Sequence, residues 1–260
     1  MPKANRLEYI LKKDRVIVSS ALFLLCLLSW LYIIYLYKQM YPMNMDALFF
    51  AMPMTADWTW TDFVLLFLMW FVMMIAMMTP SVTPLVLVFA TINRKRKEQQ
   101  NPFVPSGYLL SGYFIVWAAF SLFATLLQWL LQQVSLLNPE METTSKILGA
   151  IILISAGIFQ FTSLKVRCLK YCRTPIDFIL RKWKHGKWGA LQMGMDNGIY
   201  CLGCCWILMI LLFVSGIMNL LWIAIIAIFV LIEKVLPAAK LVSSIAGIAL
   251  IGYGLFILVE

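Results

Sequence analysis

Three of the six cysteines in the chain lie within five residues, at Cys201, Cys204 and Cys205. On a helix these positions are i, i+3 and i+4, so their thiols share one face with Met193 and Asn197 in the two preceding turns. Thiolates are the ligands that soft metal ions prefer. Small side chains on one face also let membrane helices approach closely. The stripe is therefore a soft-metal site or a packing seam, and both interpretations stay open at this point.

A second pair of thiols precedes this stripe. Cys168 and Cys172 are spaced i, i+4 and share a face if the apolar helix before them continues through both positions. The two groups together offer enough thiolates for a tetrahedral site, and packing alone does not explain the second pair. Cu(I) is the first choice of metal and Zn(II) the second, because both bind thiolate well. Nearby cations favour the thiolate form: Lys165, Arg167, Lys170 and Arg173.

Methionines supply a further set of soft donors. Met69, Met73 and Met77 are spaced i, i+4, i+8, so their thioethers lie on one face of an apolar helix. Methionine also fills gaps in irregular cores, which is the alternative explanation. The segment from Lys38 to Asp62 is expected to be an outer loop, and it holds more methionines that could capture Cu(I) or simply lie at the membrane interface: Met40, Met43, Met45, Met52 and Met54.

The elements that position these residues are apolar helices. Apolar residues make up 63% of the 260 and charged residues only 13%, and the mean hydropathy is +0.88. This composition, with several apolar runs of about 18 residues or more, predicts an all-α polytopic membrane bundle in one domain, residues 1–260. Seven spans are expected, at about residues 16–37, 63–92, 108–131, 146–163, 198–216, 217–232 and 241–259.

The positive charge of the chain lies in short blocks between these spans. The net charge is +9, but Lys and Arg collect before residue 16, at residues 94–97 and at residues 165–187. Basic blocks of this kind mark cytoplasmic loops and do not require a nucleic-acid partner. The pattern predicts an uncleaved first span, a cytoplasmic N-terminus and a C-terminus on the outer side.

Most enzyme classes lack their essential residues in this sequence. There is no glycine-rich phosphate loop and no Ser-His-Asp arrangement, and the one histidine, His185, is expected in a solvated basic loop. The chain is therefore predicted not to be an enzyme. Pro80 and Pro84 should bend the second span and free backbone carbonyls, and Cys26 is expected to be a small buried hydrophobe in the first span.

The cysteine segments resemble a known group. Residues 168–175, 198–206, 218–220 and 233–234, with the methionine-rich residues 73–80, are similar to an uncharacterised prokaryotic family of predicted metal-binding integral membrane proteins that carries a Cys-x2-Cys-Cys-Trp motif. The resemblance covers roughly residues 62–256 and implies a multi-pass protein of the bacterial inner membrane with a metal site. That family usually has a histidine where this chain has Asn197. Because an amide is a poor ligand for soft metals, the site here is all-sulfur, differently tuned or lost.

The leading hypothesis is a membrane protein that binds, and transports or delivers, copper. Metal would move from the outer methionines along Met69, Met73 and Met77 to the cysteines, since thioethers bind without deprotonation and thiolates bind more tightly. Its partners would be the lipid bilayer and a metal chaperone or another membrane subunit. Two alternatives stay open: a membrane thiol or redox component acting through Cys201 and Cys204, and a non-catalytic assembly partner in which the cysteines only pack.

Overall fold

The structure, a computed structural model, describes residues 2–40, 58–98, 103–135, 145–236 and 238–259. Within these ranges every regular element is a helix, which confirms the predicted all-α class. The methionines of the expected outer loop, Met43, Met45, Met52 and Met54, lie outside the described residues, as does the side chain of Met40.

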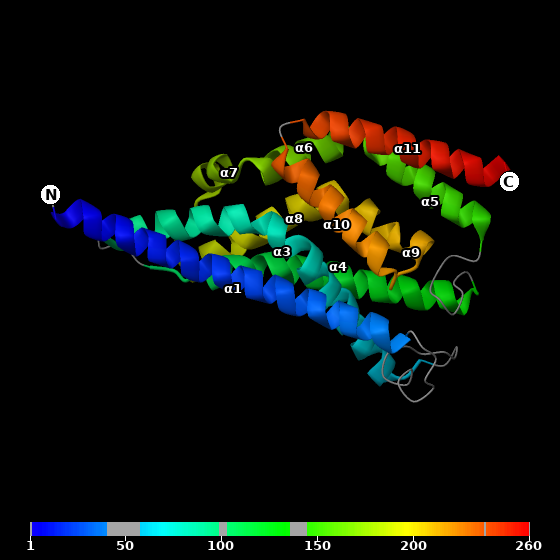
Figure 1. Cartoon of the computed structure of the whole chain (residues 1–260), viewed down its shortest axis with the longest axis horizontal. Coiled ribbons are helices and arrows are strands. Elements are labelled where there is room, and N and C mark those ends of the chain that lie inside the picture. The colour runs from blue at the N-terminus through cyan, green and yellow to red at the C-terminus, as the bar shows by residue number, and fades with distance from the viewer. Residues whose placement is uncertain (1, 41–57, 99–102, 136–144, 237, 260) are drawn as a thin grey trace.

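Long helices form one layer of the molecule. They are α1 (Pro2–Met40), α3 (Trp60–Glu98), α4 (Ser106–Gln133) and α8 (Gly186–Ile210). Helix α1 packs on α3, α3 on α4, and α4 on α8, and all run along the long axis of the molecule (Figure 1). The α4–α8 contact is especially close, because a Cβ atom at Gly194 would lie 1.9 Å from the carbonyl oxygen of Leu109 and one at Gly112 would lie 2.0 Å from that of Leu191.

Shorter helices cover one side of this layer. They are α5 (Lys146–Phe159), α9 (Leu212–Ser215), α10 (Leu220–Val235) and α11 (Ala239–Val259). Helices α5 and α11 lie side by side (Figure 1). A Cβ atom at Gly157 would lie 2.7 Å from the carbonyl oxygen of Gly247, so glycine is what permits this contact.

The chain bends sharply after α5. Helix α6 (Ser163–Arg173) follows at an angle of 63° to α5, and Thr162 caps its first turn by accepting a hydrogen bond from the backbone of Lys165. Helix α7 (Pro175–Lys182) then begins at Pro175, because the residue before a proline avoids the helical conformation and so ends the preceding helix. Cys168 and Cys172 therefore lie on α6, which packs against α8, and not on a straight continuation of α5.

In the part of the chain that the structure describes, five helices are long and apolar enough to cross a membrane, and a sixth is added if α5 and α6 count as one bent span. The five are Arg15–Gln39, Trp60–Arg94, Ser106–Gln133, Gly186–Ser215 and Ala239–Val259. The predicted spans at residues 146–163 and 217–232 correspond to α5 and α10, which have only 14 and 16 residues. The count of seven spans is therefore not confirmed.

Cys26 has a structural role that the sequence did not predict. Pro80 lies inside α3 and has no N–H to donate to the carbonyl of Ala76, four residues earlier. The thiol of Cys26 on α1 donates to that carbonyl at 3.6 Å. The expectation that Cys26 is only a buried hydrophobe is thus wrong, since the side chain is half-buried and hydrogen-bonded.

Candidate functional site

Cys201 lies in the middle of α8 and not at its beginning. It follows Gly186, the first residue of the helix, by 15 positions, or about 22 Å at 1.5 Å per residue. The helix therefore begins 12 residues before residue 198, where the sequence predicted this span to begin. The glycine-containing segment before Cys201 is helical because Gly194 and Gly198 let α8 pack directly against α4.

Polar and sulfur groups from three other helices meet at Cys201. Its thiol is buried, with 1% of the residue exposed. The ammonium group of Lys234 on α10 donates to Sγ at 2.9 Å, and the hydroxyl of Tyr113 on α4 lies 3.0 Å from the same sulfur. The thioether sulfur of Met78 on α3 is 4.0 Å away. A cysteine that served only as a packing residue would not require these polar neighbours.

Other thiols surround Cys201. Those of Cys204 and Cys205 each donate to the backbone carbonyl of Cys201 at 3.0 Å. From α6, the free thiol of Cys172 lies within hydrogen-bonding range of the thiols of Cys201 and Cys204. The structure therefore brings four predicted ligands together, three of them buried and Cys172 partly exposed, in what we call the thiol cluster: Cys172, Cys201, Cys204 and Cys205.

Cys168 lies at the edge of the thiol cluster. Its sulfur faces Gly203, where an added Cβ atom would lie 2.8 Å from Sγ. Among the described residues, no group of three or more His, Cys, Asp or Glu side chains already has the arrangement of a metal site. The side chains of Cys204 and Cys205 instead turn their thiols toward the backbone carbonyl of Cys201. Gathering the sulfurs around one ion therefore requires rotation of these side chains.

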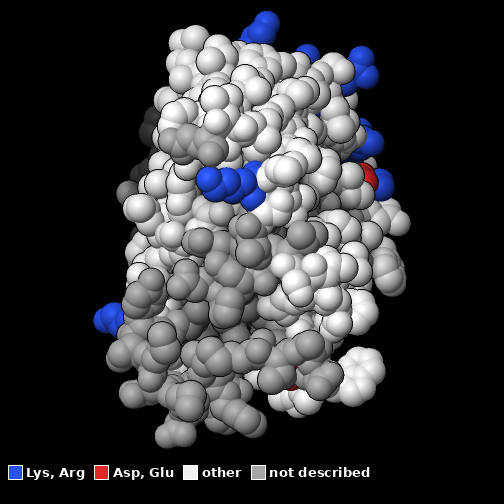
Figure 2. Space-filling view, turned by 90° about the vertical axis from the view of Figure 1, so that its right-hand side faces the viewer, with Lys and Arg blue, Asp and Glu red and all other residues white. Residues whose placement is uncertain are grey.

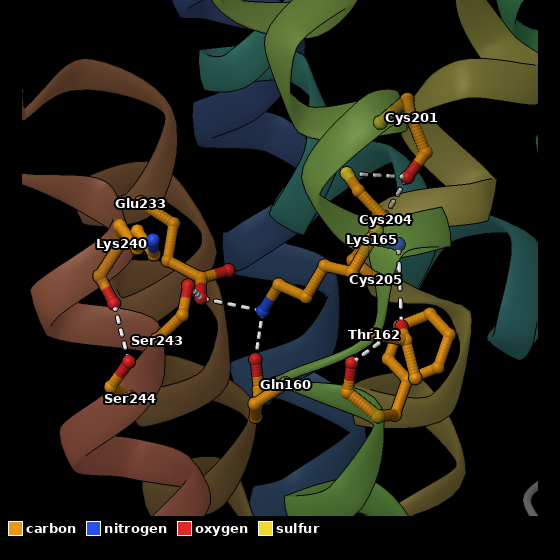
Figure 3. A network of polar contacts seen from close by, with 11 residues as sticks. Gln160, Thr162, Lys165, Cys201, Cys204, Cys205, Glu233, Lys240, Ser243 and Ser244 are labelled. Carbon is orange, nitrogen blue, oxygen red and sulfur yellow. Dashed lines mark hydrogen bonds and ion pairs between the residues drawn. The ribbon is translucent and has the colours of Figure 1, made fainter.

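The cation beside the thiols is Lys234, not Lys165. Figure 3 shows the side chain of Lys165 extending toward Gln160 and Glu233, and its Nζ lies 2.5 Å from Glu233 Oε1. Ser243 donates to the same carboxylate at 2.5 Å. The expectation that Lys165 promotes thiolate formation is therefore wrong for this residue.

Lys234 and Tyr113 are the site residues that the sequence analysis did not identify. The predicted spans at residues 217–232 and 241–259 leave Glu233 and Lys234 in the turn between them, but both residues belong to the last turn of α10 and are buried. An ionisable residue within an apolar helix is by itself a sign of a functional site, and that signal was present at Lys234. Nothing in the sequence distinguishes Tyr113 from the other tyrosines.

The predicted methionine row lies in the core. Met69, Met73 and Met77 are 5%, 1% and 2% exposed. The thioether that approaches the thiol cluster is that of Met78, which is also fully buried. The methionine face of α3 is thus directed inward, and the residue that reaches Cys201 is the one next to the predicted row.

The oxygen and nitrogen donors near the cysteines in sequence are occupied elsewhere. Asp196 pairs with Lys184 at 3.6 Å on a partly exposed surface. His185 lies 3.1 Å from the guanidinium of Arg96 and is exposed. Asn197, in the position where the resembling family has histidine, is buried one turn before the cysteine stripe on α8. Sulfur atoms are therefore the main donors that the cluster offers to a metal ion.

None of the curated proteins and none of the solved structures matches this chain. One family model matches residues 67–257 and therefore spans both helices of the thiol cluster, the methionine face of α3 and Lys234. On this match the chain belongs to the PpoB2 family, which is described as "Copper chaperone".

Proposed function

We propose that this chain is an integral membrane protein that takes up Cu(I) as cargo at the thiol cluster and passes it to an acceptor. The description of its family as a copper chaperone supports the metal and the delivery role. The observation that carries the proposal is the convergence of thiols from α6 and α8 with a thioether 4.0 Å from Cys201 Sγ.

The donor set favours Cu(I) over harder ions. Thiolate and thioether are ligands for soft metals, whereas Mg²⁺ and Ca²⁺ require oxygen ligands. The nearest buried carboxylate, Glu233, is already paired with Lys165 and Ser243. The thioether of Met78 beside Cys201 adds a soft donor that suits Cu(I). Zn(II) remains the second choice.

The surface supports a position in a membrane. Large apolar side chains point outward along α5 and α11, among them Ile151, Ile158, Ile245, Ile248 and Phe256. In water such a surface would promote aggregation, whereas in a bilayer it contacts lipid. The lipid bilayer is accordingly the first partner of the chain.

The charge distribution supports one orientation. Figure 2 views the end of the bundle beside the C-terminus, where most of the described side chains are uncharged. The opposite end, where α3 finishes and α8 starts (Figure 1), carries Arg94, Arg96, Lys184 and Lys187. By the positive-inside rule this basic end faces the cytoplasm. The proposed location is the bacterial inner membrane.

The buried methionines of α3 suggest how the cargo reaches the cluster. Thioethers bind Cu(I) without losing a proton, so they suit transient contact, and thiolates suit the endpoint. Met78 is the point where the two donor types meet. The role is non-enzymatic, with no nucleic acid involved, and the acceptor is a metal chaperone or another membrane subunit.

The test is copper stoichiometry in matched cysteine variants. The full chain, purified in detergent without oxygen, is loaded with Cu(I) and washed, and bound copper is measured by mass spectrometry. Cys201→Ser and Cys204→Ser should lose most of the bound copper. Cys26→Ser is the control, because this thiol lies on α1 and donates to a carbonyl of α3, so it should retain copper like the parent.

If the parent and all three variants bind the same amount of copper, at less than one ion per chain, the proposed metal-binding function is refuted. Thiol trapping in cells then distinguishes the remaining alternatives. A Cys201–Cys204 pair that cycles between thiol and disulfide would establish the redox role. Thiols that stay fully reduced would leave the assembly role.

A further inference from the structure

We infer that Lys234 is a specificity-determining residue, whose fixed positive charge favours a monovalent soft ion over a divalent one at the thiol cluster. The inference rests on the proposed function and adds to it the residue that selects the charge of the cargo.

Lys234 places its charge inside the protein. Only 9% of the residue is exposed, although a lysine at a helix end ordinarily extends its ammonium group toward water. Its Nζ donates to Cys201 Sγ at 2.9 Å and to Ser81 Oγ at 3.1 Å. The thiols of Cys204 and Cys172 are also within its electrostatic reach.

Among the described residues, no carboxylate forms an ion pair with Lys234 at the cluster. The adjacent residue, Glu233, pairs with Lys165 at 2.5 Å and accepts a hydrogen bond from Ser243, so its charge is already balanced (Figure 3). The ionisable groups that face Lys234 are thus the thiols of the cluster and the hydroxyl of Tyr113. A thiol loses its proton more readily than a phenol, so the sulfurs carry the negative charge opposite Lys234.

The charge of the loaded cluster then depends on the ion. When a soft ion is bound by two thiols, two sulfur–metal bonds form and both thiol protons leave to the buffer. With Cu(I) or Ag(I) the bis-thiolate carries one negative charge, which the ammonium of Lys234 neutralises. Hg(II) forms the same linear bis-thiolate but a neutral one, so Lys234 leaves the cluster with one uncompensated positive charge. Net charge in a buried site is unfavourable, and Lys234 therefore favours the monovalent ion.

The experiment compares Ag(I) and Hg(II), which share a coordination geometry and differ by one charge. Both affinities are measured on the purified full chain in detergent by competition with a small thiol. Lys234→Met should lower the ratio of Ag(I) affinity to Hg(II) affinity by about tenfold or more, because charge interactions in a buried site are weakly screened. Lys234→Arg keeps the charge and should keep the ratio.

Two further variants make the test specific. Lys234→Gln removes the charge but keeps a polar side chain that can still reach Ser81, so it replaces Lys234→Met should that variant fail to fold. Lys170→Met removes an exposed lysine from the helix that carries Cys172 and should leave the ratio unchanged. A variant that damages the cluster in general weakens the binding of both ions and leaves the ratio of Ag(I) affinity to Hg(II) affinity unchanged.

The outcomes separate this inference from the proposed function. A parent protein that binds neither Cu(I) nor Ag(I) through its cysteines overturns the proposed function. A parent that binds both ions, with the same Ag(I)-to-Hg(II) ratio in Lys234→Gln or Lys234→Met, overturns only the role of Lys234.

Discussion

The buried ion pair between Lys165 and Glu233 should make single substitutions far more damaging than the double substitution. The two side chains are 1% and 2% exposed, and Nζ lies 2.5 Å from Oε1. They come from α6 and α10, and Ser243 on α11 donates to the same carboxylate. The ion pair therefore connects the start of α6 to the end of α10, and Ser243 adds α11 to the same contact.

The expected magnitudes follow from desolvation. Lys165→Met leaves the carboxylate of Glu233 buried without a counter-charge, and losing one partner of a buried pair costs about 3–5 kcal/mol of the free energy of unfolding. Glu233→Gln should cost a similar amount because it strands the ammonium group. The double variant removes both charges, so the coupling free energy between the two sites should be roughly 2–3 kcal/mol.

The free energy of unfolding is measurable by titrating the purified full chain in mixed micelles with dodecyl sulfate and following tryptophan fluorescence. The exposed pair Lys184–Asp196, at 3.6 Å, is the matched control, and Lys184→Met should cost less than about 1 kcal/mol. The reasoning is refuted if Lys165→Met is no more damaging than this surface variant. It is also refuted if the double variant is as unstable as the sum of the two single ones.

Two more predictions concern helix packing and capping, and the same titration measures both. Gly194→Ala should destabilise the protein by at least about 2 kcal/mol, because the new Cβ would lie 1.9 Å from the carbonyl oxygen of Leu109. Gly107→Ala should be neutral or slightly stabilising, since nothing lies within 4 Å there, and equal stability of the two variants would contradict the backbone contact. Asn219→Ala should cost about 1 kcal/mol, because it removes the side-chain cap that accepts from Trp222 N, whereas Asn219→Asp should keep most of the stability.

The apolar segments could be predicted as helices because their periodicity and composition are local properties. The predicted spans at residues 108–131 and 241–259 differ by two residues or fewer at each end from α4 (Ser106–Gln133) and α11 (Ala239–Val259). The start of α8 could not be predicted in this way. Glycine is a poor helix former, and the close packing of Gly194 and Gly198 against α4, which stabilises the helix there, is a tertiary contact.

The thiol stripe was predictable for the same local reason, since i, i+3 and i+4 share a face on any helix. Its neighbours depend on tertiary structure. Lys165 is close to Cys168 in sequence, yet its ammonium group pairs with Glu233 and not with the thiols. This pairing occurs where α6 follows α5 at an angle of 63°. Lys234 is far from the cysteines in sequence, yet its ammonium group is the one that reaches Cys201.

The length of α10 explains why a Glu-Lys pair is buried where the sequence indicated a loop. Its 16 residues span about 24 Å, which is shorter than a hydrocarbon core of about 30 Å. Helix α5, with 14 residues, is shorter still, and both helices end beside α6 (Figure 1). A helix that stops inside the bundle places its last polar residues there and not on the surface of the molecule. The short helices thereby bring Glu233 to Lys165 and Lys234 to the thiols halfway along α8, so the charge at the cluster is a consequence of helix length.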